Sequence, residues 1–364
     1  MGQFALNATL KRPSELSAIE RGAWDAFIDG NAALASPYFR LEFAECCEEA
    51  RSDTRILIAR KGMEIIGFLP MQMGKVGYAR PLAGPLGDVQ GAITPDSYTA
   101  DIAAWLSAAN VPLLEFQSAL ALQGCWSDVE RWRDGSWIID TSRGFDAFEA
   151  ERTEAEPKAF RNIRARQRKL EAIDGGFEFR MMDDRPEILQ TMLDWKRAQY
   201  RRTKVFDVFS VAWTRRLMRA LLNKQTDRFS GLSSSLNIDG KIAAVHIGMA
   251  SESRCHYWFP AYDPTFNKVS PGLLLLIEMI RRASDQGHDS VELGPGDYDF
   301  KRNLSSYQIP LSAGCVVTRS PAAALRSAAR AMAGAAEKAP LGKAGTIPRR
   351  LLRRADKLSA FYAV

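Results

Sequence analysis

The chain is poor in the residues that most often build metal and covalent-catalysis sites. It has five cysteines and three histidines among 364 residues, and their spacing matches neither a disulfide framework nor a zinc site. It also lacks the GxxxxGK[ST] phosphate loop and the GxSxG nucleophile elbow, which argues against P-loop enzymes and common serine hydrolases. We therefore expect chemistry that uses neither a metal nor a covalent nucleophile.

Long apolar segments are absent as well. The densest apolar run, Leu273–Ile277, ends at Glu278 and is far shorter than the roughly 20 residues of a membrane-spanning helix. The first ten residues show no signal-peptide pattern, so we expect a cytoplasmic protein. The composition, 46% hydrophobic and 25% charged, is typical of a soluble globular protein, and the length predicts two domains.

Positive charge is concentrated at the C-terminal end. Residues 319–364 hold ten Lys and Arg against Glu337 and Asp356, a net charge of +8 in a chain of net +6. A basic amphipathic helix here would lie on an anionic membrane, hold an anionic ligand, or pack on the body of the protein. Arginine side chains in this tail could each bond a phosphate through two nitrogen atoms, which predicts binding of cyclic di-GMP or an anionic lipid. The candidate residues are Arg349, Arg350, Arg353 and Arg354. No DNA partner is expected.

The order of predicted elements indicates an α/β protein with two similar halves. In the second half, the pattern predicts a strand at 177–181 followed by two helices, one at 186–202 and one capped by Ser210. Three antiparallel strands (229–238, 241–250, 254–261), a helix from 270 and a strand at 290–293 are predicted to follow. The first half repeats this order in part, with a capping box at Ser17 and Glu20 and a hairpin at 55–73. We expect domains at 1–156 and 173–318, a linker helix at 157–172 and a basic helical tail at 319–364.

The linker helix has an apolar face and a basic face. Phe160, Ile163 and Leu170 share the first, and the second is formed by arginines. One interpretation is a solvated linker, and the other places these arginines beside a phosphate-bearing substrate. The residues concerned are Arg161, Arg164 and Arg168.

A helix start after the strand at 254–261 is the first candidate site. Ser270 before Pro271 predicts an N-cap followed by the first helical position. Free amides at such a helix start bind pyrophosphate well, and Gly272 would let a ligand approach closely. The alternative is an ordinary helix start whose glycine allows tight packing. Asn267, Lys268, Ser270 and Gly272 are the predicted carrier-binding residues.

The second candidate is the loop after the strand at 290–293. Gly294 and Gly296 bend the chain where open α/β sheets tend to bind ligands, and possible bases lie beside a cation that can stabilise an oxyanion. A Gly- and Asp-rich segment is also a common plain turn. His246, in the middle of a strand, is either a core histidine or a base. The predicted catalytic residues are Lys301, Asp297, His246 and Tyr298.

Together these motifs resemble those of the CelD-type acetyltransferases of the GNAT superfamily. The similarity is carried by Tyr262-Asp-Pro, Ser270-Pro-Gly-Leu-Leu-Leu-Leu and Gly294-Pro-Gly-Asp-Tyr-Asp-Phe-Lys301. The chain is more distantly similar to the FemABX peptidyltransferases, which are tandem GNAT domains with a basic helical segment between them. The resemblance implies tandem GNAT-like domains with mixed, mainly antiparallel sheets, the first of them degenerate. It also implies an acyl carrier in the second domain and a role for Lys301.

The function expected from this resemblance is N-acyl transfer from acetyl-CoA or another acyl-CoA. The acceptor would be an amino sugar in bacterial exopolysaccharide or cell-envelope biosynthesis. A thioester is already activated, so the protein has to position it, remove a proton from the amine and stabilise an oxyanion. Lys301 is the predicted oxyanion or phosphate partner and Asp297 the base, with His246 as its rival. The alternatives are a FemX-like aminoacyl-tRNA-dependent transferase and a regulatory protein that binds cyclic di-GMP or lipid through its tail, peripherally at the membrane.

Overall fold

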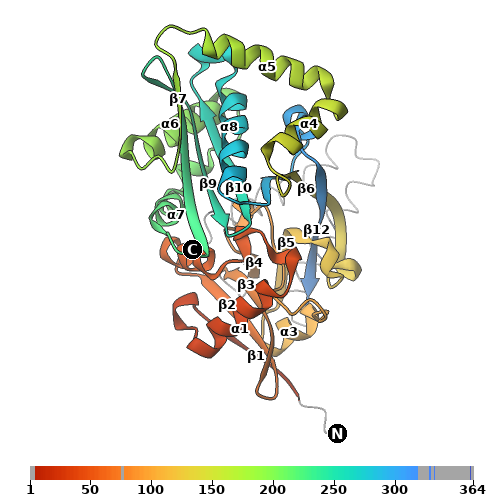
Figure 1. Ribbon diagram of the computed structural model, residues 1–364. Coiled ribbons are helices and arrows are strands. Elements are labelled where there is room, and N and C mark those ends of the chain that lie inside the picture. The colour runs from red at the N-terminus through yellow and green to blue at the C-terminus, as the bar shows by residue number, and fades with distance from the viewer. Residues whose placement is uncertain (1–4, 75–77, 319–327, 329–331, 333–360, 362–364) are drawn as a thin grey trace. The chain divides into compact units, whose positions relative to one another are not determined.

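The computed structural model describes residues 5–74 and 78–318, together with residues 328, 332 and 361 (Figure 1). The chain packs into two compact units. The first contains the described residues of Met1–Leu34, Arg51–Arg133 and Leu311–Val364. The second contains Ala35–Ala50 and Asp134–Pro310. The unit boundaries therefore follow packing and cross the ranges expected from the sequence, because 35–50 and 134–156 pack with the second unit.

The first unit is built on a mainly antiparallel sheet with the strand order β1-β2-β3-β4-β5-β12. Only the neighbours β4 and β5 run parallel among the pairs described in this unit. The strands are β1 (Leu6–Lys11), β2 (Thr54–Lys61), β3 (Glu64–Met73), β4 (Tyr78–Pro81), β5 (Leu113–Leu120) and β12 (Tyr307–Val317), whose first residues belong to the second unit.

Helices α1 (Ala18–Asp29) and α3 (Ile102–Ala108) pack against strands of this sheet. The predicted capping box begins α1, because Ser17 Oγ accepts from the Glu20 amide and Glu20 accepts from the Ser17 amide. Trp105 of α3 is completely buried in the core of the unit. The hairpin expected at 55–73 is confirmed as β2 and β3. Short 3-10 helices connect these elements: η1 (Pro13–Glu15), η2 (Ala32–Leu34), η5 (Gly84–Leu86), η6 (Ala121–Gln123) and η7 (Ser127–Val129).

The second unit has a mixed sheet with the strand order β6-β11-β10-β9-β8-β7. Strands β10 and β11 run parallel, and the other neighbours are antiparallel. The strands are β6 (Glu130–Asp140), β7 (Phe177–Met181), β8 (Phe229–Ile238), β9 (Lys241–Ser251), β10 (Arg254–Tyr262) and β11 (Ser290–Gly294). The expected α/β class with mainly antiparallel sheets is thus confirmed.

Helices cover both faces of this sheet (Figure 1). Helices α6 and α7 lie on one face, and α8, with α4 and α5, lies on the other. The bounds are α2 (Leu41–Ala50), α4 (Phe145–Ala155), α5 (Pro157–Glu171), α6 (Pro186–Thr203), α7 (Ala212–Asn223), α8 (Pro271–Asp285) and α9 (Asp299–Leu304), with 3-10 helices η3 (Pro37–Phe39), η8 (Val208–Ser210) and η9 (Pro264–Val269). Helix α5 buries the three apolar residues predicted to share a face.

Two local predictions for this unit are wrong. Ser210 does not cap α7: Val211 holds the N-cap position, and Ser210 Oγ donates instead to the Asp207 carbonyl at 2.7 Å. The segment from Asp297 to Lys301 is not a loop throughout, because α9 begins at Asp299 and includes Lys301.

The ladder between β10 and β11 is short. It runs from Arg254 opposite Ser290 to His256 opposite Glu292, whereas β10 continues to Tyr262. The register of β10 against β9 also shifts just after His256. The two parallel strands therefore separate after one short paired stretch. The sheet is therefore interrupted between β10 and β11, beyond the paired residues.

Candidate functional site

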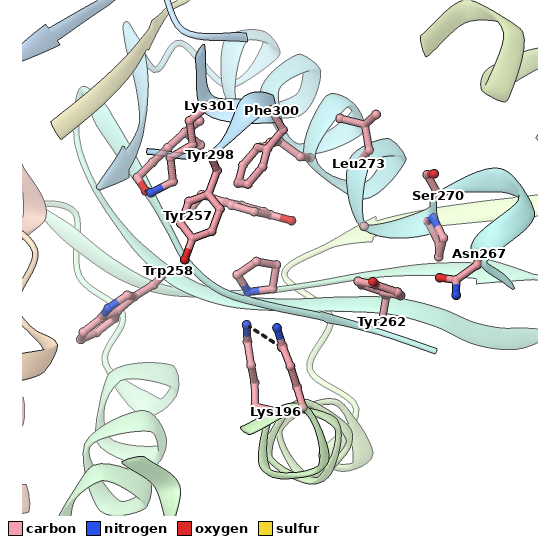
Figure 2. Close-up of a pocket in the computed structure, with 16 residues that line it drawn as sticks. Lys196, Tyr257, Trp258, Tyr262, Asn267, Ser270, Leu273, Tyr298, Phe300 and Lys301 are labelled. Carbon is pink, nitrogen blue, oxygen red and sulfur yellow. Dashed lines mark hydrogen bonds between the residues drawn. The ribbon is translucent and has the colours of Figure 1, made fainter. Parts of the chain in front are cut away.

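A pocket of about 500 Å³ lies where β10 and β11 separate. Figure 2 shows Lys196 of α6 on one side of the strand ribbons, with Leu273 of α8 and Ser270, which precedes that helix, on the other side. The pocket is therefore lined by residues from both faces of the sheet. Sixteen residues line it: Lys196, Gln199, Tyr257, Trp258, Pro260, Tyr262, Asn267, Ser270, Pro271, Gly272, Leu273, Leu276, Leu293, Tyr298, Phe300 and Lys301.

The predicted helix start forms one wall of this pocket. Helix α8 begins at Pro271, directly after Ser270. The backbone of Ser270 is in the left-handed region, with φ of 54°, and its side chain makes no capping hydrogen bond. Its carbonyl oxygen accepts from the amides of Leu273 and Leu274, at 3.0 and 3.2 Å.

Fewer amides are available at this helix start than the sequence suggested. Pro271 has no N–H, and those of Leu273 and Leu274 already bond Ser270. Gly272 is thus the one residue of the first four whose amide is neither missing nor bonded to Ser270. A Cβ atom at Gly272 would lie 3.2 Å from the Tyr262 ring, so this glycine also lets the helix pack closely on β10.

The other two predicted carrier-binding residues differ in position. Asn267 lines the pocket next to Ser270. Lys268 is exposed and is not part of the lining. The structure therefore brings three of these four residues to one wall.

Lys301 is almost completely buried, with 8% of its surface exposed, and lines the pocket. Its Nζ donates to the carbonyl oxygens of Leu293, Gly294 and Pro295, at 2.7, 3.2 and 2.7 Å. An ammonium group has three N–H donors, so these bonds use all of them. Lys301 holds the turn after β11, and its predicted role toward an oxyanion or phosphate remains a prediction.

Tyr298 and Asp297 precede Lys301 and face different surroundings. Tyr298 lines the pocket, 60% exposed, and its ring lies 5.6 Å from Lys301 Nζ. Asp297 is outside the lining and forms an exposed ion pair with Arg302, which also pairs with Asp299. The structure thus gathers Tyr298 and Lys301 at the pocket and leaves Asp297 on the surface.

His246 lies inside the core of the second unit and does not line the pocket. Its Nε2 accepts a hydrogen bond from the Trp258 amide at 3.2 Å, so Nδ1 carries the proton and donates to Ser234 Oγ, also at 3.2 Å. The ring stacks on Tyr257 with centroids 4.2 Å apart. Burial lowers the pKa of His246 well below its ordinary value. Both ring nitrogens are therefore occupied in a neutral imidazole.

Two residues that sequence reasoning missed point to this pocket. Lys196 of α6 is partly buried in the lining, and its Nζ donates to Gln199 Oε1 at 3.3 Å (Figure 2). The hydroxyl of Tyr257 is buried, and no residue that the structure describes forms a hydrogen bond with it. A sequence signal existed for the lysine, because it continues the i, i+4 spacing of the buried residues Ile188 and Met192.

A buried polar cluster of the second unit lies outside the pocket lining. Glu292 of β11 is completely buried, and its two carboxylate oxygens accept from Ser36 Oγ at 2.7 Å and Ser136 Oγ at 2.8 Å. His256 Nδ1 lies 3.6 Å from the same carboxylate, and Tyr38 contacts the other ring nitrogen at 3.2 Å. Burial raises the pKa of Glu292, but these neighbours outweigh it and lower the pKa to about 2.

The predicted basic surfaces are only partly within the described residues. Arg161, Arg164 and Arg168 are exposed on α5. Arg164 contacts Thr153 at 3.0 Å and Glu149 at 3.6 Å, both on α4. None of the three lines the pocket. The tail arginines lie outside the described residues: Arg349, Arg350, Arg353 and Arg354.

Neither a metal cluster nor a membrane span occurs in the part of the chain that the structure describes. No three His, Cys, Asp or Glu side chains gather there as a metal site would require. Among the same residues, no helix combines the length and apolar character needed to cross a bilayer.

Comparison with known protein families finds a match to part of the second unit. Residues 157–302 match the model of an acetyltransferase (GNAT) domain. No curated protein matches the chain. Residues 157–302 contain all sixteen residues that line the pocket. The pocket is therefore lined wholly by residues of the segment that matches this family.

Several solved structures share the fold over most of the chain. FemX has a TM-score of 0.56 at 11% identity, covering 85% of this chain and 98% of its own. A tandem GNAT protein from the clavulanic acid biosynthesis pathway has a TM-score of 0.51 at 11% identity, covering 86% and 98%. The C-terminal domain of a protein described as a lysylphosphatidylglycerol synthetase, from Agrobacterium fabrum, has 0.52 at 13%, covering 85% and 96%. At these identities the similarity concerns the fold.

Proposed function

We propose that the GNAT-type domain at residues 157–302 transfers an acyl group from acetyl-CoA or another acyl-CoA to an amino group. We further propose that the acceptor is an amino sugar of bacterial exopolysaccharide or cell-envelope biosynthesis, as in the CelD-type enzymes that the sequence resembles. The observation that carries the proposal is the pocket between the separated strands β10 and β11. It has lining residues on both faces of the sheet, and we assign one side to the donor and the other to the acceptor.

The donor is proposed to enter along α8. Asn267, Ser270 and Gly272 line that wall, and the positive end of a helix dipole stabilises phosphate groups. The apolar side chains Leu273, Leu276 and Leu293 follow deeper in the lining. They provide an apolar wall for the uncharged arm of an acyl carrier.

The acceptor is proposed to enter from the side of α6. Aromatic residues line the pocket, among them Trp258, Tyr298 and Phe300. Aromatic rings give a sugar ring a flat apolar surface to pack against. Attack of the amine on the thioester then produces an oxyanion within the pocket.

Tyr257 is the proposed donor to that oxyanion. Tyr257 lines the pocket, and its buried hydroxyl has no hydrogen-bond partner among the described residues. Burial raises its pKa, so the phenol stays protonated and can donate. A donor of this kind that meets the developing charge lowers the barrier by about 3 kcal/mol.

Two measurements test the proposed reaction. Calorimetry with coenzyme A and with acetyl-CoA reports donor binding, and chromatography follows coenzyme A release with glucosamine, galactosamine and UDP-glucosamine. We expect binding and amine-dependent release. Absence of coenzyme A binding at millimolar concentration would rule the function out.

The aminoacyl-tRNA-dependent alternative is favoured by one observation, the exposed basic face of α5. Loss of transfer after ribonuclease treatment, with no transfer from acetyl-CoA, would select it. Binding of cyclic di-GMP or anionic lipid by the tail is a separate proposal. It is tested by calorimetry and liposome sedimentation with and without residues 319–364.

A further inference from the structure

The pocket contains positive charge and no negative charge. Its lining, all of it within the described residues, includes two lysines and neither aspartate nor glutamate. An acyl transfer to an amine nevertheless needs a group that removes a proton from the attacking nitrogen. That group must lie at the pocket and must have a lone pair available.

The two lysines of the lining differ in what their nitrogen atoms do. Lys301 donates to three backbone carbonyls, which requires all the hydrogens of an ammonium group. Lys196 Nζ has one hydrogen bond within the described structure, to Gln199 Oε1 at 3.3 Å. Lys196 is therefore able to hold a lone pair while keeping that bond.

The bases expected from the sequence are not in position to compete. Asp297 is on the surface in its pair with Arg302. The acceptor lone pair of His246 is used by the Trp258 amide. Three tyrosines also line the pocket: Tyr257, Tyr262 and Tyr298. Burial raises the pKa of Tyr257, which favours its neutral phenol.

We propose that Lys196 is the base of the transfer and that its uncharged amine takes the proton from the acceptor nitrogen. This assignment rests on the proposed acyltransferase function and adds the residue that completes it. Lys196 approaches the pocket from α6, the side proposed for the acceptor, and faces the strand that carries Tyr257 (Figure 2).

The proposed step conserves atoms and charge. The acceptor nitrogen forms the C–N bond to the thioester carbon, and the carbonyl electron pair moves to oxygen. The proton then leaves the positively charged nitrogen for the lone pair of Lys196. The carbonyl forms again, the C–S bond breaks, and the thiolate leaves with the electron pair. The Lys196 ammonium returns its proton to the thiolate, which restores the free amine.

The surroundings of Lys196 support an uncharged amine near neutral pH. Burial lowers its pKa to about 8. The titratable groups nearby are Tyr200 on the same helix, Tyr257 and Tyr262 on β10, His246 on β9, and Tyr298 and Lys301 after β11. Asp207, the carboxylate that interacts with Tyr200, is paired with Arg197 of α6 at 2.9 Å.

The test compares three variants with the wild type. Lys196→Met removes the base, and Lys196→Arg keeps the positive charge but cannot give up a proton at these pH values. Lys241→Met, at an exposed position at the start of β9 outside the lining, is the control. Acetyl-CoA is the donor, and the acceptor is whichever of glucosamine, galactosamine and UDP-glucosamine gives the fastest coenzyme A release.

We expect both Lys196 variants to lower kcat by about 100-fold or more, with coenzyme A affinity within threefold of wild type. The wild-type rate should rise with pH through about 8, as the Lys196 amine loses its proton. The acceptor amine titrates as well, so the informative quantity is the ratio of wild-type to Lys196→Met rates. That ratio should rise through the same pH, and Lys241→Met should resemble the wild type.

Two negative results have different meanings. If Lys196→Arg keeps more than a tenth of wild-type kcat, the residue acts through its charge and the assignment as base is overturned. If the wild type neither binds coenzyme A nor releases it with any of the amines, the proposed function fails and the assignment fails with it. The wild-type measurement therefore separates the two failures.

Discussion

Lys301 Nζ donates to the carbonyl oxygen of Pro295 at 2.7 Å, in the turn that follows β11. Lys301 also donates to the carbonyl oxygens of Leu293 and Gly294, so one side chain bonds three consecutive carbonyl groups at this turn. Replacing Lys301 by methionine removes all three bonds, two of them buried. We expect the free energy of unfolding to fall by about 2–4 kcal/mol and turnover to fall by about two orders of magnitude, because the pocket residues beside this turn lose their position.

Urea unfolding and steady-state kinetics on the same preparation check this prediction. Arg302→Met serves as a stability control, because Arg302 is a neighbouring cation on α9 whose ion pairs are exposed. An unchanged unfolding midpoint for Lys301→Met would show that the bonds do not support the turn. Near-normal turnover in that variant would remove Lys301 from the mechanism.

Asp297→Asn should change turnover by less than about twofold. The carboxylate is 76% exposed in its pair with Arg302 and is outside the pocket lining, and exposed ion pairs contribute little to stability. Initial rates of coenzyme A release measure the effect. A hundredfold loss would assign the base to Asp297 and exclude Lys196.

Glu292→Gln should remove a pH dependence of stability. The folded-state pKa of Glu292 is about 2 and its ordinary value is 4.5, so the folded protein binds the proton more weakly than the unfolded chain. Its contribution, about 3 kcal/mol, is fully present above pH 4.5 and is lost as the pH falls toward 2. Denaturant unfolding of both proteins between pH 3 and pH 7 reports it.

In that experiment the wild type should lose stability more steeply than the variant below pH 4.5. Parallel curves for the two proteins would mean that Glu292 is not ionised in the folded state. Glutamine at this position still accepts from one serine hydroxyl, so we expect the variant to fold.

Gly248→Ala should destabilise the second unit by about 2 kcal/mol or more. An added Cβ would lie 2.2 Å from the His256 carbonyl oxygen and 2.6 Å from His246 Nε2. Gly22→Ala is the matched control, because no atom lies within 4 Å of the added Cβ. It should raise stability slightly, since alanine favours a helix more than glycine does. Equal thermal midpoints for the two variants would contradict the close packing around His246.

Local patterns predicted much of the second unit. The bounds of β7 and β8 follow directly from alternation and turn residues, and the face of α5 follows from helical periodicity. Strand β6 was missed because its first half carries exposed charged residues and shows little of the alternation that a half-buried strand normally has. Its pairing with β11 is set by contacts distant in the sequence.

The candidate site was predicted in outline and missed in detail. The helix start at Ser270 and the turn near Lys301 do meet at one pocket. The helix start follows β10 and the turn follows β11, and these are the two neighbouring strands that separate. Lys196 was missed since a lysine within a helix is normally assigned to solvent. Its position depends on the packing of α6 against β10, which no local pattern contains.

Helix α2 belongs to the second unit although 83 residues of the first unit, Arg51–Arg133, follow it in the chain. It is held by Lys224, which bonds Glu45 at 2.7 Å, and by Arg216, which bonds the Ala50 carbonyl at 2.9 Å. A recombinant fragment limited to residues 134–310 would therefore expose the side of α7 that α2 covers. During synthesis α2 lacks these two partners until Arg216 and Lys224, more than 160 residues later in the chain, have been translated, so the second unit cannot complete its packing while only its first segment has been made.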